Sequence, residues 1–541
     1  MSIFQLPKSS TFDANSSNAG IYNQKLTQVA SSREIASAAF PNGDIRYKWN
    51  VPSSQWWLPD NSYISAQYDL TRGDGAAITM EDGVSAAMNM LSTQFQTCEL
   101  LMNGTTLSRT SAYVPQVSTL EHRLSKTGSW LDSIGSATMN YDSLEVRQVN
   151  LANDGNRNGE VPSTEQVDSQ AVLGMGATTE IAVTPQVAGS PALLTFSVVT
   201  RTKAQLQELF PVNSVIRFGA ALGGVTECLV VGHDTNVLLV ASDITVVGAA
   251  VVAFSRVIRG VEAGRRVKTF ELSWKPPLSV LTSIKHAIPG ECNMELILQP
   301  LPSSSYMTSA VQTKLGSTKA QGLTANDIKL DLKSMFYYTQ IVEGARVSGN
   351  ENYILDLQQT RCQSSIVTSA DSAQYLFEIS PSTRAISFAL QDIRCDSNTS
   401  FSTTEFKSYN NAGTERVDDL LTRFSISYGG RQYPSPDAQV SFNTGTDLTT
   451  REYLNTHLQS GLYSSDAGPE TLSQFGDRGR IVYIEIPRDN RDKSTRLVVT
   501  LQFVSTAEFA NTRILLFDHS TQIGQISMVD ESVRDIVIAD A

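Results

Sequence analysis

The stretch RYKWNVPSSQWWL (Arg46–Leu58) decides the fold, because its layout returns later in the chain. It reads as an alternating strand, a Pro-Ser break and the aromatic start of a second strand. LFEISPSTRAISFAL (Leu376–Leu390) has the same order, and its Pro381 lies 329 positions after Pro52. This pairing predicts two copies of one β-rich plan in a single chain.

Two hairpins extend the repeat. CELLMNGTTLS contains Asn103-Gly104 and RFSISYGGRQY contains Gly429-Gly430, dipeptides that supply the positive-φ residues of a two-residue turn. A stretch with helical spacing follows each hairpin, near Leu120 in the first copy and near Leu454 in the second. We therefore expect a hairpin and then a short helix in both copies.

The first copy carries an insertion. KTFELSW (Lys268–Trp274) matches RIVYIEI (Arg480–Ile486) at an offset of only 212, so about 115 extra residues precede Lys268. Short β-runs separated by Gly, Asp and Asn fill that interval, as in a small β-barrel or sandwich. An insertion that folds on its own adds little loop-closure entropy.

Each copy then has about eight strands with long connections, which favours a jelly roll over an up-and-down barrel. We expect an all-β fold of two tandem eight-stranded jelly rolls with a β-rich insertion in the first. The expected boundaries are an N-terminal arm over 1–44, a first jelly roll over 45–345 interrupted at about 150–266, and a second jelly roll with a C-terminal tail over 346–541.

One helix is expected early in the first copy. Its apolar residues recur at the spacing of a single helix face, behind Thr79 as the N-cap: Val84, Ala87, Met88, Leu91 and Phe95. We interpret this stripe as core packing.

Composition excludes several classes of protein. The chain has 541 residues, 41% of them hydrophobic and 18% charged, which is typical of ordered globular domains. A net charge of −12 argues against binding nucleic acid, and the densest basic cluster, Arg256–Lys268, is interpreted as a solvated loop. The N-terminal MSIFQLPKSS lacks the pattern of a signal peptide, and the apolar window Val237–Phe254 is too short for a membrane span. We expect a non-secretory protein without a transmembrane segment.

The sequence offers no catalytic, cofactor or metal site. It contains no G-x-x-x-x-G-K-[ST], G-x-S-x-G or H-E-x-x-H motif. Asp418-Asp419 and the pair Asp69 and Asp74 are interpreted as turn residues rather than paired acids. The isolated cysteines and histidines show no metal-ligand spacing and are expected to be structural: Cys98, Cys228, Cys292, Cys362 and Cys395, with His122, His233, His286, His457 and His519. We therefore expect no enzyme activity.

Trp56-Trp57 is the one candidate for a ligand platform, because β-sandwich lectins stack sugars on exposed aromatics. Adjacent strand residues point to opposite faces, so at most one of the two could face a ligand. Their flanking prolines, Pro52 and Pro59, favour the floor of a sheet-to-sheet contact instead.

Several motifs together resemble double-jelly-roll major capsid proteins of eukaryotic DNA viruses, most of all those of polinton-like viruses and their relatives. They are WNVPSSQWWLPDNSYISAQYDLTRGDG (Trp49–Gly75), Asn103-Gly104, GSWLD (Gly128–Asp132), SWKPPLSVL (Ser273–Leu281), HAIPG (His286–Gly290) and RILLFD (Arg513–Asp518). The resemblance covers about Ile45–Met528 apart from the insertion, and its motifs are structural.

The resemblance implies a self-assembling major capsid protein in the virion. Three chains would form a homotrimeric, pseudo-hexameric capsomer that tiles an icosahedral shell, assembled inside the host cell. Implied partners are neighbouring trimers, penton proteins and minor capsid or cement proteins, and the insertion would face outward. The alternatives are a β-sandwich receptor- or carbohydrate-binding spike protein, and a polysaccharide hydrolase on a jelly-roll scaffold.

Overall fold

The structure is a computed structural model, which describes the strands, the helices and the turns between many of them. The described residues are 23–35, 43–53, 55–72, 84–86, 89–127, 130, 134–135, 137–138, 166–168, 179–184, 192–196, 202–203, 206–207, 210, 212, 215–222, 225–241, 248–252, 254–258, 269–285, 287–301, 311–313, 328–343, 351–369, 373–396, 402–404, 406, 421–439, 442–443, 446–447, 450–458, 481–486, 495–503, 511–529 and 532–540.

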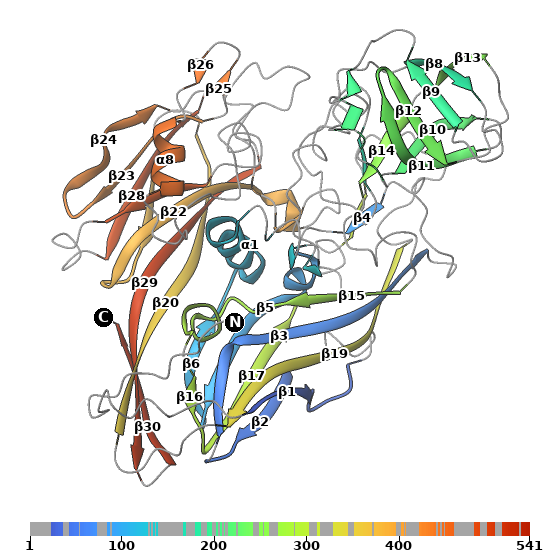
Figure 1. Cartoon of the computed structure of the whole chain (residues 1–541). Helices are drawn as coiled ribbons and strands as arrows, with labels where there is room; N and C mark the ends of the chain where they lie inside the picture. The colour runs from blue at the N-terminus through green and yellow to red at the C-terminus, as the bar shows by residue number, and fades with distance from the viewer. Residues whose placement is uncertain are drawn as a thin grey trace, which may run out of the picture.

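The first sandwich consists of two antiparallel sheets (Figure 1). One sheet has the order β1 (Asn23–Ala30), β19 (Ile328–Glu343), β3 (Gln55–Arg72) and β15 (Thr269–Trp274), with β16 (Ile288–Pro289) also paired to β3. The other has the order β2 (Ile45–Val51), β17 (Cys292–Pro300), β5 (Phe95–Met102) and β6 (Thr105–Thr110). Alternate residues of β2 and β17 are buried, so their period-2 pattern turns one face toward the core.

The second sandwich repeats this architecture. One sheet has the order β20 (Glu351–Ile366), β29 (Thr512–Val529), β22 (Thr383–Asp392) and β27 (Val482–Glu485), with β30 (Ser532–Asp540) paired to β29. The other has the order β21 (Ala373–Glu378), β28 (Arg496–Phe503), β23 (Leu421–Tyr428) and β24 (Arg431–Gln439). When the eight main strands of each sandwich are numbered in chain order, with β16 and β30 left out, the strand orders are 1-8-3-6 and 2-7-4-5 in both. The chain therefore folds as two jelly rolls of identical topology, as the sequence predicts.

Both expected hairpins are confirmed. β5 and β6 meet at Asn103 and Gly104, whose φ values are 49° and 83°. β23 and β24 meet at Gly429 and Gly430, with φ values of 58° and 77°. Positive φ at both central residues is the requirement of the type I′ turn.

The two expected helices also form, α1 (Val114–Ser125) after the first hairpin and α8 (Thr450–Leu458) after the second. Figure 1 shows α1 between the two sandwiches. The shorter helical segments are η2 (Met90–Gln94), α6 (Ser279–Ser283) and η6 (Ile393–Asp396).

The helix expected over Val84–Phe95 is wrong. Val84–Ala86 is the short strand β4, which pairs with β18 (Val311–Thr313), and Phe95 begins β5. Asn89 lies between them with φ 52°, in the left-handed region, where a right-handed helix cannot pass. The apolar residues therefore belong to different elements, and Thr79 lies outside the described residues.

The expected N-terminal arm is wrong where it includes β1. That strand pairs with β19 along its whole length, from Asn23 opposite Glu343 to Ala30 opposite Phe336. The strands of the first sandwich therefore begin before Ile45, at Asn23, and residues 1–22 lie outside the described part of the chain.

The insertion between α1 and β15 forms a sheet of its own, which stands apart from the two sandwiches in Figure 1. Its strand order is β13 (Gly248–Val252), β8 (Thr179–Thr184), β9 (Ala192–Phe196), β12 (Val237–Ala241), β11 (Val225–Asp234), β10 (Val215–Leu222), β14 (Phe254–Ile258) and β7 (Gln166–Asp168). A small pair, β25 (Phe442–Asn443) and β26 (Thr446–Asp447), precedes α8.

Candidate assembly interface

The two sandwiches meet where α1 covers the outer face of the β22 and β29 sheet. Val117, Leu120 and Leu124 of α1 recur at i, i+3 and i+7 and are all buried. They form one apolar cluster with residues of the second sandwich: Ala385, Ala389, Phe406, Ile481, Tyr483, Leu515 and Phe517. A helix of the first jelly roll thus supplies the cover for a sheet of the second.

A second apolar contact joins the sandwiches through Trp56. Its ring lies 6.1 Å from that of Tyr353 on β20, edge to face at 88°. The same buried cluster contains further residues from β20, β29 and β30: Leu355, Leu357, Ile526, Met528 and Ile536. Aromatic pairs in this geometry stabilise a contact by more than their buried area alone provides.

Trp57 points the other way, into the core of the first sandwich. Its ring lies 5.7 Å from that of Trp49, and its Nε1 donates a 2.6 Å hydrogen bond to Thr339 Oγ1. Both tryptophans are buried, so the interpretation of this pair as core and sheet-to-sheet contact is confirmed.

Hydrogen bonds between the sandwiches accompany the apolar contacts. Tyr113 shares a 2.6 Å bond with Ser364, Gln359 Nε2 donates to Arg109 O at 3.0 Å, Gln116 Nε2 donates to Gln391 Oε1 at 3.2 Å, and the Gln358 amide donates to Ser283 Oγ at 3.2 Å. Apolar contacts combined with direct hydrogen bonds are typical of stable interfaces.

Arg513 is a buried charge at this interface. Its Nε and Nη2 donate to Gln391 Oε1 at 3.0 and 2.6 Å, and its Nη1 donates to Asp396 Oδ2 at 2.8 Å. The guanidinium carbon lies 5.8 Å from the ring centroid of Tyr113, the residue that precedes α1. Because a buried guanidinium needs partners for its donors, this network holds η6 and α1 to β29.

This network has no local signature in the sequence. Tyr113 has φ 56°, which a tyrosine rarely adopts and no local pattern predicts. Arg513 and Gln391 are joined by pairing between β22 and β29, across more than a hundred residues. The only signal was the RILLFD motif, which contains Arg513.

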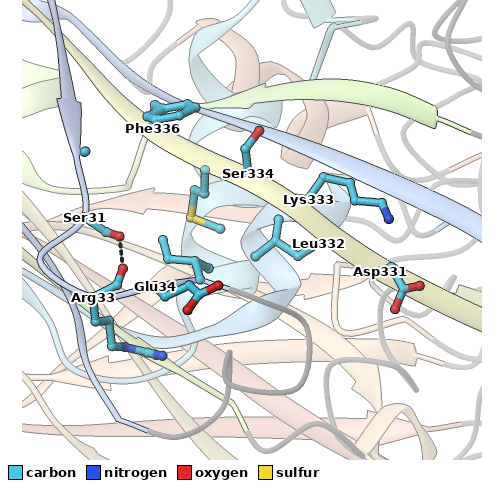
Figure 2. A pocket seen from close by; sticks show the side chains of 11 residues that line it. Ser31, Arg33, Glu34, Asp331, Leu332, Lys333, Ser334 and Phe336 are labelled. Atoms are coloured by element: carbon cyan, nitrogen blue, oxygen red, sulfur yellow. Dashed lines mark hydrogen bonds between the residues drawn. The ribbon is translucent and has the colours of Figure 1, made fainter.

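A pocket of about 510 Å³ lies where β1 leaves its sheet (Figure 2). β1 ends at Ala30 opposite Phe336, and Ser31 then bridges to Tyr47 of the other sheet. Figure 2 shows the segment with Ser31, Arg33 and Glu34 on one side and β19 with Asp331–Phe336 on the other. The pocket is thus the space that a longer first strand would fill, as β20 does in the second sandwich.

The pocket holds no recognisable chemistry. Arg33 donates to the carbonyl oxygens of Gly43 and Asp44, which ties down the connection between the sheets. Lys333 lies 3.1 Å from Asp69 Oδ2, which places Asp69 in an ion pair. Among the described residues, no group of His, Cys, Asp or Glu side chains could hold a metal ion.

The histidines that the structure describes occupy structural positions: His233 and His519 are buried and His122 is half-buried. Burial lowers the pKa of His519 to about 4, and its Nε2 lies 2.8 Å from Ser387 Oγ. The pKa of His122 is lowered to about 3, mainly by burial and also by the nearby positive charge of Lys126. The ring of His122 stacks on that of Trp130. His233 Nε2 contacts the carbonyl oxygen of Phe210. The side chains of His286 and His457 lie outside the described residues.

The cysteines are free thiols, and all are buried except the half-buried Cys362. Burial raises the pKa of Cys292 to about 12 and also raises that of Cys98, Cys362 and Cys395. They therefore act as small apolar side chains. Asp418-Asp419, Asp74 and residues 259–268 of the basic cluster lie outside the described part of the chain.

Comparison with known proteins bears on the fold. No family model and no curated protein sequence matches the chain. A chain in the cryo-EM structure of the Sputnik virophage is similar at 11% identity and a TM-score of 0.50, over 96% of this chain and 89% of that one. The Faustovirus major capsid protein matches at 7% identity and a TM-score of 0.45, over 96% and 92%. The mavirus major capsid protein matches at 9% identity and a TM-score of 0.42, over 100% and 96%.

This chain has the double-jelly-roll fold of viral major capsid proteins. Among the helices that the structure describes, none is both long and apolar enough to cross a membrane.

Proposed function

We propose that this chain is a major capsid protein that assembles as homotrimeric, pseudo-hexameric capsomers into an icosahedral shell. The observation that carries the proposal is the pair of jelly rolls with identical strand order, locked together by a buried interface. Three such chains present six similar sandwiches, the number that fills a hexagonal outline. The likeness to a chain of a virophage particle supports the same proposal.

The parts of the chain take corresponding roles in this proposal. Residues 45–345, together with β1, form the first jelly roll, and 346–541 form the second. The insertion at about 150–266 faces outward from the shell. Partners are neighbouring trimers, penton proteins and minor capsid or cement proteins, and the role is structural rather than enzymatic.

The test is the mass and shape of the purified protein. Light scattering after gel filtration gives three times the 58.9 kDa chain mass, and negative-stain microscopy shows pseudo-hexagonal particles. Obligate interfaces are large and apolar, so the trimer persists at micromolar concentration. A stable monomer at that concentration contradicts the proposal.

A further inference from the structure

The helix α8 of the second sandwich repeats α1 of the first, but its apolar face is not covered in the same way. The two helices share a Leu-x-x-x-Leu pattern, Leu120 and Leu124 in α1 and Leu454 and Leu458 in α8. Leu120 is 0% exposed because it packs on the neighbouring sandwich, whereas Leu454 is 40% exposed.

Each helix is tied to the same strand of its own sandwich. Trp274 at the end of β15 donates from Nε1 to Ser118 of α1 at 3.0 Å. Thr456 of α8 donates to Ile481 O at 3.0 Å and accepts from the Tyr483 amide at 3.1 Å, next to and within β27. Since β15 and β27 hold the same place in the two strand orders, both helices stand at equivalent positions.

The sheet face that α1 covers in the second sandwich also has a counterpart in the first. Phe517 of β29 pairs with Ser387 of β22 and packs in the cluster under α1. In the first sandwich, Phe336 of β19 likewise pairs with Ser65 of β3. β19 and β3 hold the places in the strand order that β29 and β22 hold in the second sandwich. Phe336 therefore holds the position of Phe517.

This counterpart face is aromatic and only half covered. Phe336 is half-buried, as are Tyr63 and Tyr338, whose rings stack at 5.2 Å and 15°. Gln340 follows Tyr338 by two residues on the same face of β19, and Leu26 of β1, which pairs with Gln340, is 53% exposed. Each chain thus exposes a face of α8 and a face of the β3 and β19 sheet. The equivalent surfaces, the face of α1 and the face of the β22 and β29 sheet, are buried against each other inside the chain.

We propose that Leu454 of one copy packs against Phe336, Tyr63 and Tyr338 of a second copy. This contact extends the α1 interface from one chain to the next, because it uses the repeat of each partner surface. The contact is head-to-tail, so repeated copies close into a ring when the rotation permits. The inference rests on the proposed function, which sets that ring at three chains.

The experiment pairs a charge substitution with a cross-link. Leu454→Glu places a carboxylate in the contact and is expected to weaken trimer association at least tenfold, measured by light scattering at micromolar concentration. Leu229→Glu is the matched control, since Leu229 is 37% exposed and lies on β11 of the insertion. The control is expected to remain trimeric.

The cross-link decides which surfaces meet. A chain with both Leu454→Cys and Phe336→Cys is expected to give covalent trimers after oxidation, on a non-reducing gel. The native thiols interfere little, because all but Cys362 are buried and burial raises the pKa of Cys98, Cys292, Cys362 and Cys395. Leu229→Cys with Phe336→Cys is expected to give none. A symmetric contact would stop at covalent dimers, so a band at the dimer alone overturns the proposal.

The two proposals fail in different ways. If the wild-type chain is monomeric, the capsomer proposal falls and this contact falls with it. If the wild type is trimeric but Leu454→Glu leaves the trimer intact and the cysteine pair does not cross-link, only this contact is wrong.

Discussion

Gly290 in the HAIPG turn gives a sharp test of the fold around Trp56. A Cβ atom built there would lie less than 3.0 Å from the carbonyl oxygens of both Pro52 and Gln55. Both are backbone atoms, so no side-chain rotation can relieve the overlap. Gly290→Ala must therefore shift the turn that follows β16, the strand paired with Trp56 and Trp57.

The cost can be estimated from the contacts at risk. The Gln55 amide donates to Pro52 O at 2.9 Å, and the Glu291 amide donates to Val51 O at 2.7 Å. Losing two such bonds costs about 2 kcal/mol, and overpacking a tight site adds about 1–3 kcal/mol. We expect Gly290→Ala to lower the free energy of unfolding by about 3–5 kcal/mol.

The assay is urea unfolding followed by tryptophan fluorescence, at one protein concentration for all variants. Gly104→Ala is the control, because its Cβ meets nothing within 4 Å and only its φ of +83° is unfavourable. That strain costs about 1–2 kcal/mol. A Gly290→Ala variant no less stable than Gly104→Ala would refute the close approach of Gly290 to the Pro52 turn.

Three further predictions concern the interface. Leu120→Ala should lower the free energy of unfolding by about 3 kcal/mol, as for a leucine in a closed core. Leu454→Ala should lower it by under about 1 kcal/mol in the dissociated chain. Equal losses in urea unfolding would show that Leu454 is already covered. Arg513→Met should cost about 2 kcal/mol by removing the two hydrogen bonds that the guanidinium donates to Gln391 Oε1, and Arg513→Lys should recover little because an ammonium cannot reproduce the fork. An unchanged Tm for the Met variant would count against the network. Burial lowers the pKa of His519 from 6.5 to about 4, so the unfolded chain binds this proton more tightly than the folded chain. The free energy of unfolding therefore falls by on the order of 3 kcal/mol as the pH drops through that range. His519→Gln should lose this part of the pH dependence, and a parallel decline of wild type and variant in thermal unfolding between pH 7 and 4 would disprove it.

The parts of the fold with a local signal could be predicted from the sequence. Asn103-Gly104 and Gly429-Gly430 specify their turns by backbone freedom alone, and the flanking strands alternate because one face is buried. The adjacency of Trp56 and Trp57 was enough to place them on opposite faces. Repetition of these signals then predicted the duplicated architecture.

Other parts depend on contacts that local patterns do not contain. β1 is an edge strand whose side chains are mostly exposed, with Val29 buried, so NQKLTQVA shows no apolar alternation. The stripe from Val84 to Phe95 matched a helix by coincidence of spacing, and the backbone conformation of Asn89 decided otherwise. The partners of Arg513 come together only after two distant strands pair.

β29 belongs to both hydrophobic cores. Ile514 and Leu516, near its start, pack in the core of the second sandwich, while Ile526 and Met528, near its end, pack in the cluster of the first. A single unbroken strand therefore joins the cores of two sandwiches that have the same strand order. Because unfolding of one sandwich removes part of the core of the other, the whole chain should unfold in one cooperative transition. Neither sandwich should fold when it is expressed alone.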